Sequence, residues 1–323
     1  MELSAARPGP TVDPPELAAR IVASVGRVVR VPDDLLRLVA ICLLAEGHLI
    51  IEDVPGVGKT KLAKALAASL DVDFRRLQFT PDLLPTGVTG VNVFDQSRNE
   101  FRFRPGPVFT QILLVDEVNR AGPKTQSALL ESMQEGQVTV DGVTRRLPRP
   151  QMVIATQNPV EYEGTFPLPE AQLDRFAMRL SLGYPSADEE ARMLAEHGRA
   201  DPLDDVTPVA DADDLIAAIA TCRAVHVEPD VNRYVVALLG RTRADERLLL
   251  GGSPRSGIVL IRLAKARAML DGRDYVLPDD VKALAVPTLS HRLLLGPEAR
   301  ARGLSATSLI EDALARTPVP VGT

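Results

Sequence analysis

The chain has 323 residues, of which 45% are hydrophobic and 25% are charged, and its formal net charge is −6 at pH 7. This composition is ordinary for a globular protein, and the length is sufficient for two domains. The acidic charge balance, the absence of tryptophan and the small share of aromatic residues argue against a dedicated nucleic-acid binder, which usually carries a basic surface and aromatic stacking platforms.

No apolar run is long enough to span a membrane, and the first 15 residues lack the apolar core of a signal peptide, so we expect a cytoplasmic protein without a membrane role. The only two cysteines, Cys42 and Cys222, lie in apolar helical runs and are expected to be buried or half-buried thiols, not a disulfide. The four histidines are scattered without metal-ligand spacing, so we predict no zinc site.

In chain order, residues 1–15 are rich in proline and alanine and are predicted to form a flexible leader. Residues 16–200 then alternate short apolar runs with helical patterns. Continuous apolar runs suit strands that are buried on both faces, so the alternation predicts an α/β fold with a parallel sheet and helices on both faces. We predict strands at 48–52, 74–79, 111–116, 151–156 and 178–182, and helices at 35–45, 59–70, 124–135 and 187–199.

Two predicted hairpins interrupt this alternation. The first covers about residues 87–103, with a turn at 96–99. The second pairs residues 137–140 with 143–147 around Asp141-Gly142, which is a strong signal for a two-residue turn. Hairpins inserted into an α/β core are usually working parts or partner surfaces.

The strand signals fade after residue 186. Residues 201–213 are rich in aspartate, proline and alanine and are predicted to be a linker. Residues 214–316 are predicted to form a small all-helical domain, and residues 317–323 a flexible tail. The helical patterns of this half lie near 212–223, 229–244, 254–270 and 278–294.

A glycine-rich segment between the first of these strands and its helix closely matches a phosphate-binding P-loop. Its glycines let the backbone approach phosphate oxygens, and the helix N-terminus adds partial positive charge. Lys59 can reach the β- and γ-phosphates, and the Thr60 hydroxyl can ligate Mg²⁺. The consensus begins with glycine where this chain has Asp53, and the alternative is a glycine-rich turn before a surface helix. The segment consists of Asp53, Val54, Pro55, Gly56, Val57, Gly58, Lys59 and Thr60.

Two carboxylates, Asp116 and Glu117, directly follow the apolar run 112–115. The carboxyl end of a buried strand is where open α/β sheets bind ligands. Asp116 would hold Mg²⁺, mainly through water, and Glu117 would polarise an attacking water as a general base. The competing explanation is a helix start, where acidic residues are also common.

Three further polar residues stand at places that suit phosphate chemistry. Asn158 follows another buried run and could bond the γ-phosphate or the attacking water, although asparagine before proline also forms turns. Arg175 is of the type that stabilises charge on a transferring phosphoryl group. Ser253-Pro254 predicts a helix start that places Arg255 on the first turn, where it could reach the γ-phosphate across a domain cleft or simply face solvent.

These motifs, in this order and at this spacing, resemble those of the AAA+ ATPases, and the finer match is to the MoxR family. The resemblance covers about residues 16–300. It implies a P-loop NTPase fold, with an α/β nucleotide-binding core over residues 16–200 and a helical lid domain over residues 214–316. The segments that carry the match are 51–60, 104–109, 116–121, 124–126, 155–159, 161–167, 170–176 and 253–255.

The resemblance also implies a role for each residue. Lys59 and Thr60 match Walker A, and Asp116 and Glu117 match Walker B, so ATP and Mg²⁺ are the implied cofactors, with Thr60 and Asp116 on the metal. Gly26 falls where the adenine pocket begins, although Arg27 replaces the usual glutamine. The implied nucleotide-binding set is Asp53, Pro55, Gly56, Val57, Gly58, Lys59, Thr60, Asp116 and Gly26.

Three residues complete the implied catalytic set alongside Glu117. Asn158 matches sensor 1, and Arg175 matches the arginine finger that completes the site of a neighbouring protomer. Arg255 matches sensor 2, at the start of a lid helix. With nucleotide between the core and the lid, binding and hydrolysis would change the orientation of the lid through Arg255.

The family implies partners as well as chemistry. Its members assemble as rings, usually hexamers, and are similar to chaperones that mature client proteins by metal-cofactor insertion or complex assembly. They commonly work with a protein that carries a von Willebrand factor A domain. The two hairpins match the helix-2 insert and the pre-sensor-1 hairpin of the clade.

Three other interpretations of the function stay open. A nucleic-acid motor or loader is favoured only by Arg145, Arg146 and Arg149 on the second hairpin, which are otherwise a solvated basic face. A nucleotide sensor without hydrolysis conflicts with the filled catalytic positions. A magnesium-chelatase subunit shares the architecture, but the run at 161–167 favours MoxR.

Overall fold

The structure is a computed structural model that describes residues 13–54, 56–158, 164–196 and 201–320. Its centre is a five-stranded sheet with the order β2-β5-β8-β1-β9, in which every neighbouring pair is parallel. The parallel sheet is therefore confirmed, and each strand ends within two residues of its expected bounds. The strands are β1 (Leu49–Glu52), β2 (Phe74–Gln78), β5 (Ile112–Asp116), β8 (Met152–Gln157) and β9 (Met178–Leu180).

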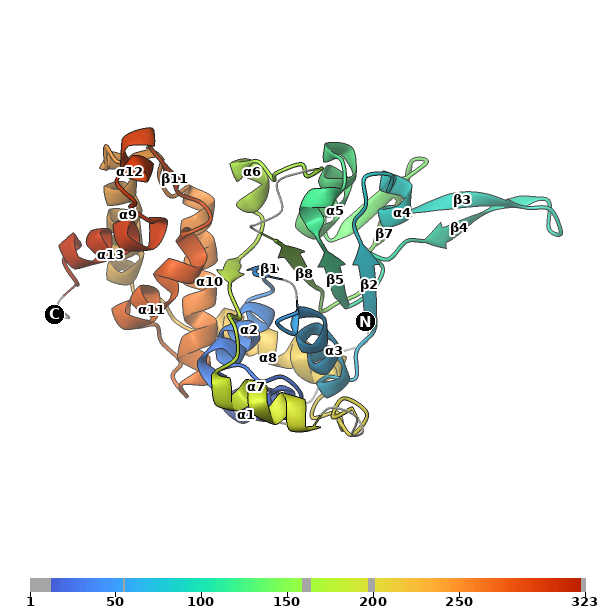
Figure 1. The fold of residues 1–323 in the computed structure, drawn as a ribbon, viewed down its shortest axis with the longest axis horizontal. Coiled ribbons are helices and arrows are strands. Elements are labelled where there is room, and N and C mark those ends of the chain that lie inside the picture. Colours follow the sequence, from blue (N-terminus) through green and yellow to red (C-terminus); the bar gives the residue numbers. More distant parts are fainter. Residues whose placement is uncertain (1–12, 55, 159–163, 197–200, 321–323) are drawn as a thin grey trace, which may run out of the picture.

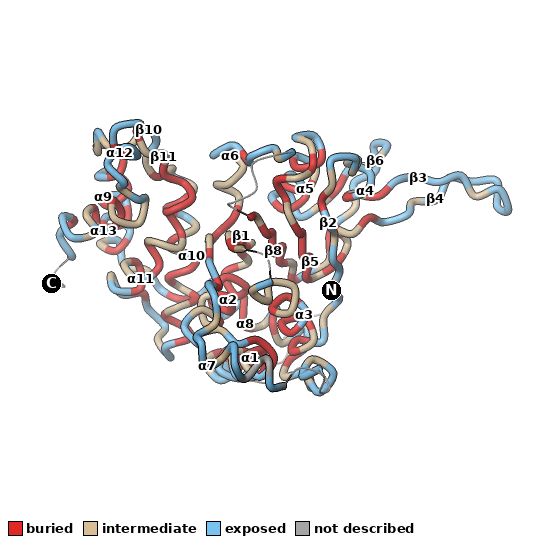
Figure 2. The backbone as a smooth tube through the Cα atoms, viewed as in Figure 1, coloured by how far each residue is buried: buried red, intermediate tan, exposed pale blue. Residues whose placement is uncertain are grey.

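Alternate residues of the central strands enter two separate hydrophobic cores, one on each face of the sheet. In β5, Ile112 and Leu114 belong to one core, and Leu113 and Val115 belong to the other. All four side chains are buried, which explains why this strand is a continuous apolar run in the sequence. Figure 2 shows the resulting buried centre.

Helices cover both faces of the sheet, as expected (Figure 1). The first core packs under α1 (Pro14–Val28), α2 (Asp33–Leu44) and α3 (Lys59–Ser69), and the second under α4 (Pro85–Thr89) and α5 (Pro123–Glu135). Because α1 begins at Pro14, the last two residues of the expected leader are helical, and residues 1–12 lie outside the described part. Both cysteines are free and buried, as predicted.

The second domain is the expected helical domain, and it also contains a short antiparallel pair formed by β10 (Leu248–Leu250) and β11 (Leu294–Leu295). This pairing explains why the helix expected at 278–294 ends at Leu289. The last two helices, α12 (Pro297–Ala301) and α13 (Ala306–Arg316), were not predicted, although Ser305 caps α13 by accepting from Ser308 N–H. The helices after the sheet are α7 (Ala187–Glu196), α8 (Ala212–Ala224), α9 (Pro229–Ala244), α10 (Pro254–Leu270), α11 (Pro278–Leu289), α12 (Pro297–Ala301) and α13 (Ala306–Arg316).

The first core continues without a break from the sheet into this lid domain, because Leu260 and Leu263 of α10 belong to the same cluster as Leu49 and Ile51 of β1. Helix α10 packs against α1, α2 and α8. Among the described residues, none of the helices combines the length and apolarity that crossing a membrane requires.

Both expected hairpins are present. Strands β3 (Gly90–Asp95) and β4 (Glu100–Pro105) form an arm that projects far from the body (Figure 1), and β6 (Gln137–Val140) pairs with β7 (Val143–Arg146). The hairpins touch each other, because Asn92 Nδ2 donates to Asp141 Oδ2 at 2.6 Å and the Arg145 guanidinium lies 3.9 Å from the centre of the Phe103 ring. The two inserts are therefore mechanically connected.

The base of the arm needs glycine at position 106, because two backbone segments meet there. A Cβ on Gly106 would lie 2.3 Å from Val88 O and 2.5 Å from Gly90 N. We expect Gly106→Ala to lower the free energy of unfolding by about 2 kcal/mol, since backbone atoms must move apart. Urea denaturation tests this, with Gly240→Ala in the open interior of α9 as a control that should stabilise slightly. Equal effects of the two substitutions would contradict the packing argument.

Candidate active site

The glycine-rich segment joins the carboxyl end of β1 to the first turn of α3. Gly56 and Gly58 have φ of 90° and 94°, a left-handed conformation that disfavours side chains. Gly58 is the N-cap of α3, and its lack of a side chain leaves the first amides of the helix open toward an anion. Of the expected binding residues, Pro55 lies outside the described part of the chain.

Lys59 folds back over this loop. Its Nζ donates to Asp53 O at 2.7 Å, so the ammonium lies beside the main chain at the end of β1. In this position the cation can exchange a carbonyl partner for phosphate oxygens. Thr60 follows in the first turn of α3 and is partly exposed.

The Asp53 carboxylate is turned toward the end of β9. Its Oδ2 accepts from the main-chain N–H groups of Leu182 and Gly183, the latter at 2.9 Å, and from Ser181 Oγ at 3.2 Å. The expected contribution of Asp53 to nucleotide binding would therefore come from its main chain. Its side chain joins the chain after β1 to the chain after β9, a contact that the sequence pattern did not predict.

The two expected carboxylates stand at the carboxyl end of β5, each with a partner from β2. Asp116 is 7% exposed, and its Oδ2 accepts from Arg76 Nε at 2.6 Å. Glu117 Oε2 accepts from Gln78 Nε2 at 2.6 Å and lies 3.1 Å from Arg120 Nε. The sequence pattern did not predict Arg76 and Gln78, because only the pairing of β2 with β5 brings them to the two acids.

Thr156 connects the two acids to the neighbouring strand β8. Its Oγ1 donates to Asp116 Oδ1 at 3.2 Å and accepts from Glu117 N–H at 2.9 Å. Asn158 follows the same strand and is buried. Because β8 lies between β5 and β1, the end of β8 places Asn158 between the acid pair and the glycine-rich loop.

Gly26 lies near the start of α2, since a Cβ there would be 3.4 Å from Leu36 Cδ1. The chain just after α1 approaches the glycine-rich loop, because Val29 Cγ1 lies 3.8 Å from a Cβ built on Gly58. The structure therefore brings this region to the loop. It is a suitable apolar neighbour for a base bound beside the loop.

The donors at this edge of the sheet fit a magnesium ion. A carboxylate and a hydroxyl, from Asp116 and Thr60, are the hard oxygen ligands that Mg²⁺ prefers. The pairing of Asp116 with Arg76 shows that the carboxylate already takes a cationic partner. These oxygens would therefore suit a magnesium ion that is carried mainly by nucleotide phosphates.

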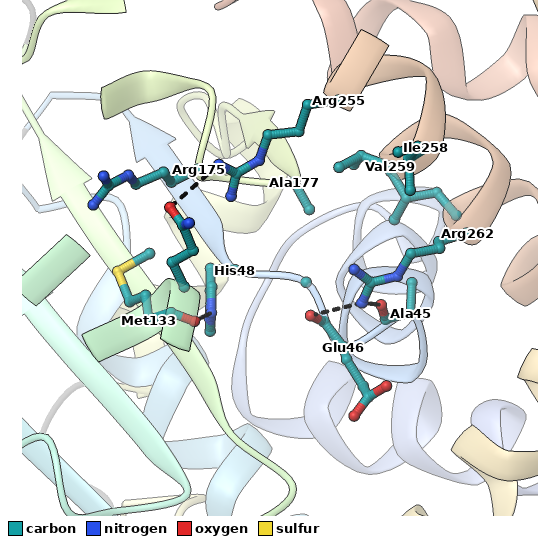
Figure 3. Close-up of a pocket in the computed structure, with 13 residues that line it drawn as sticks. Ala45, Glu46, His48, Met133, Arg175, Ala177, Arg255, Ile258, Val259 and Arg262 are labelled. Atoms are coloured by element: carbon teal, nitrogen blue, oxygen red, sulfur yellow. Dashed lines mark hydrogen bonds between the residues drawn. The ribbon is translucent and has the colours of Figure 1, made fainter. Parts of the chain in front are cut away.

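Arg175 and Arg255 lie together at the opposite edge of the sheet. They line one cavity of about 360 Å³ with His48, Gln134 and Arg262 (Figure 3). Arg255 Nη1 donates to Gln134 Oε1 at 3.4 Å. His48 directly precedes β1, and the glycine-rich loop follows the same strand, so the cavity and the loop lie at opposite ends of β1.

This placement differs from the expectation that Arg255 faces its own nucleotide across a lid cleft. Helix α10 is held along α2 by Arg262, which donates to the carbonyls of Ala45 and Glu46. The first turn of α10 therefore lies at the amino edge of the sheet. Arg255 is beside Arg175 and remote from Lys59 within one chain.

His48 supports this cavity as a neutral ring. Its Nδ1 accepts from Val153 N–H at 3.0 Å, and its Nε2 lies 3.2 Å from Met133 O, to which it donates in that tautomer. Exclusion of water lowers the pKa of His48 to about 4, and the charges of Arg262 and Arg255 act in the same direction. The ring connects β1, β8 and α5 and carries no charge that would repel the arginines.

Two family models match the chain. The ATPase family associated with various cellular activities (AAA) matches residues 48–178, and the AAA lid domain matches residues 240–313. These matches agree with the parallel sheet, the glycine-rich loop and the acid pair at the end of β5. The protein is a P-loop ATPase of the AAA+ type.

Comparison with similar proteins identifies the family within the AAA+ ATPases. The chain is 38% identical to Chaperone MoxR1 of Mycobacterium tuberculosis, over 93% of this chain and 82% of that protein. It is 47% identical to the uncharacterized protein YeaC of Bacillus subtilis, over 94% and 95%. The crystal structure of a candidate ATPase from Cytophaga hutchinsonii superposes with a TM-score of 0.87 at 38% identity, covering 95% of this chain and 96% of that one. The chain belongs to the MoxR family of AAA+ ATPases.

The magnesium-chelatase alternative receives less support. The subunit ChlI-1 of Arabidopsis thaliana is 34% identical, but the match covers 58% of this chain and 44% of that protein. The match to MoxR1 extends through the lid domain, which is why the MoxR assignment is preferred.

The role of Asp53 can be tested by separating stability from nucleotide binding. We expect Asp53→Ala to lower the free energy of unfolding by about 2 kcal/mol, because the buried Leu182 N–H loses its acceptor. Asp53→Asn keeps one acceptor oxygen and should lose less. The affinity for a fluorescent ATP analogue should stay within a few-fold. Unchanged urea denaturation with lost nucleotide binding would show instead that the carboxylate acts on the nucleotide.

His48 predicts a pH dependence of stability. Because its pKa is lower in the folded chain than in the unfolded chain, the unfolded state binds the proton more readily, and stability falls as the pH drops below about 6.5. We expect titration of His48 to lower the free energy of unfolding by on the order of 2 kcal/mol between pH 7.5 and pH 5. Urea denaturation of wild type and His48→Gln at both pH values measures the difference. The same loss in both proteins would contradict the prediction.

Proposed function

We propose that the protein hydrolyses ATP with Mg²⁺ in a homo-oligomeric ring in which each site is shared between two subunits. The observation that carries this proposal is the separation of Arg175 and Arg255 from Lys59 within one chain. These arginines stand at the other end of β1 from their own P-loop, and they lie together at a surface that a neighbour's P-loop could meet. A head-to-tail contact of this kind gives a ring when the rotation between subunits closes, and a hexamer is the ring size that the family implies.

Each expected site residue has a task in this arrangement. Gly56, Val57, Gly58 and Lys59, with Pro55, would hold the phosphates, and the region after Gly26 would take the base. Thr60 and Asp116 would hold the metal, which supplies charge neutralisation on the phosphates. These groups position the nucleotide and do not themselves react.

The hydrolytic step depends on the residues at the end of β5 and β8. Glu117 would accept the proton of the attacking water once Gln78 and Arg120 release its Oε2. Asn158 would orient that water or the γ-phosphate. Arg175 and Arg255 of the preceding subunit would stabilise the negative charge that develops on the transferred group.

The two hairpins would transmit conformational changes at the nucleotide site to a client protein. The arm β3–β4 projects from the body, and its contacts with β6–β7 couple it to the helix α5, which leads from the acid pair to the second hairpin. The name of the relative MoxR1 supports a chaperone-like activity. We propose that the ring remodels or matures client proteins in the cytoplasm, by metal-cofactor insertion or complex assembly, together with a von Willebrand factor A domain protein.

The nucleic-acid alternative loses its main support. Of the three arginines on the second hairpin, Arg145 stacks on Phe103, and Arg149 pairs with Glu46. Only part of this basic group is therefore available to a phosphate backbone. We do not favour a motor or loader function.

A mixture of two inactive variants tests the shared site. Glu117→Gln should lower kcat by on the order of a hundredfold or more, and Arg175→Ala by about a thousandfold. In a one-to-one mixture, an Arg175→Ala subunit keeps its own acids and can receive the finger of a Glu117→Gln neighbour. Random assembly should then restore about a quarter of the sites.

The measurement is ATP hydrolysis, with light scattering to confirm that the two variants assemble together. A mixture of Glu117→Gln with Lys59→Ala is the matched control, because neither subunit then offers an intact site. Co-assembly without restored hydrolysis in the test mixture would refute the shared site.

A further inference from the structure

The segment that carries Arg175 is held by the lid domain. We call residues 174–177, between α6 (Glu170–Leu173) and β9, the finger segment. Arg292 comes from the turn between α11 and β11 and is 3% exposed. Its Nε donates to Asp174 Oδ1 at 2.7 Å, and its Nη2 donates to Phe176 O at 2.6 Å. Its Nη1 donates to Ala177 O at 3.2 Å, so one side chain contacts three of the four residues.

A second side chain of the lid also contacts the finger segment. His291 Nε2 lies 3.1 Å from Phe176 O. Burial lowers the pKa of His291 well below its usual range, and the neighbouring Arg292 charge acts in the same direction. The ring is therefore neutral, and with its proton on Nε2 it donates to the same carbonyl as Arg292.

Asp174 also contacts the helix that carries Arg255. Ser253 Oγ lies 3.3 Å from Asp174 Oδ2, to which it donates, and accepts from Ser256 N–H at 3.1 Å as the N-cap of α10. The carboxylate of Asp174, which directly precedes Arg175, therefore contacts Ser253, the N-cap two residues before Arg255. The two arginines that line the same cavity are connected through Asp174.

The chemistry of this contact favours a fixed geometry over a loose attachment. A planar guanidinium with several donors bonds a carboxylate and carbonyls in one orientation, which a lysine ammonium cannot reproduce. Burial lowers the pKa of Arg292, and the Asp174 carboxylate opposes that shift. Removing Asp174 would leave the charge of Arg292 buried without a carboxylate partner.

We propose that Asp174 and Arg292 are positioning residues that lock the finger segment to the lid, so that Arg175 and Arg255 move as one body. The proposal rests on the shared site described above, because it assumes that Arg175 acts on the neighbouring subunit. Reorientation of the lid in one subunit is then transmitted directly to the arginines at the next site. The simpler alternative is an interdomain ion pair that only stabilises the packing of the lid.

The two explanations differ in which subunit of a shared site needs Arg292. In the mixture above, Arg175→Ala supplies the P-loop and Glu117→Gln supplies the finger. Adding Arg292→Met to the finger-supplying subunit should lower the restored hydrolysis tenfold or more, because a misplaced catalytic group can cost about a hundredfold. Adding Arg292→Met to the P-loop-supplying subunit should leave it within about twofold of the parent mixture.

Matched variants separate position from stability. Arg273→Met removes another lid arginine, which pairs with Asp280 at 2.7 Å and does not touch the finger segment, and it should be neutral in either subunit. Arg292→Lys keeps the charge without the planar fork and should fall between wild type and Arg292→Met. Apparent KM for ATP should change little, whereas kcat should fall, because the P-loop itself is intact.

Hydrogen exchange gives a readout that does not depend on activity. In Arg292→Met, peptides that contain the finger segment should exchange faster than in Arg273→Met, while peptides of the P-loop should not change. Equal losses in both subunit positions, or unchanged exchange of the finger segment, would overturn the positioning role. If the parent mixture itself restores nothing, the shared site fails instead, and the two failures are thereby distinguished.

Discussion

All five strands of the central sheet run in the same direction, and this constraint separates the chemistry of the molecule into two places. The carboxyl edge collects the glycine-rich loop, the acid pair and Asn158, because each directly follows a strand. The amino edge collects Arg175, which directly precedes one. Since no strand reverses, Arg175 and the P-loop of the same chain stand at opposite edges of the sheet. This separation is the basis of the proposal that a second copy completes the site.

The way in which the lid packs reinforces this separation. The first hydrophobic core runs from β1 into α10 without interruption, so the lid shares a core with one face of the sheet. Arg262 then holds the middle of α10 to a carbonyl after α2, and Arg292 holds the finger segment through a main-chain carbonyl. Asp53 makes a comparable contact at the other edge, between the ends of β1 and β9. Polar side chains therefore hold the strand ends that the hydrophobic cores leave at the surface.

Several features could be predicted because they depend on neighbours in the sequence. The strands follow from apolar runs, the P-loop from glycine spacing, and the turn at Asp141-Gly142 from its dipeptide. Contacts across the fold could not be predicted in this way. No sequence motif marks Arg76, and only the pairing of β2 with β5 brings it to Asp116. Arg292 likewise follows a helix that the sequence pattern extended too far.

The sequence by itself determined which groups are available and at which strand ends they stand, because side-chain chemistry and local periodicity are properties of the chain. The tertiary structure decided which groups meet. It turned the Asp53 carboxylate toward β9, and it placed Arg255 beside Arg175. Both outcomes depend on how α10 and the strand ends pack against segments more than a hundred residues away, and no local pattern encodes that packing.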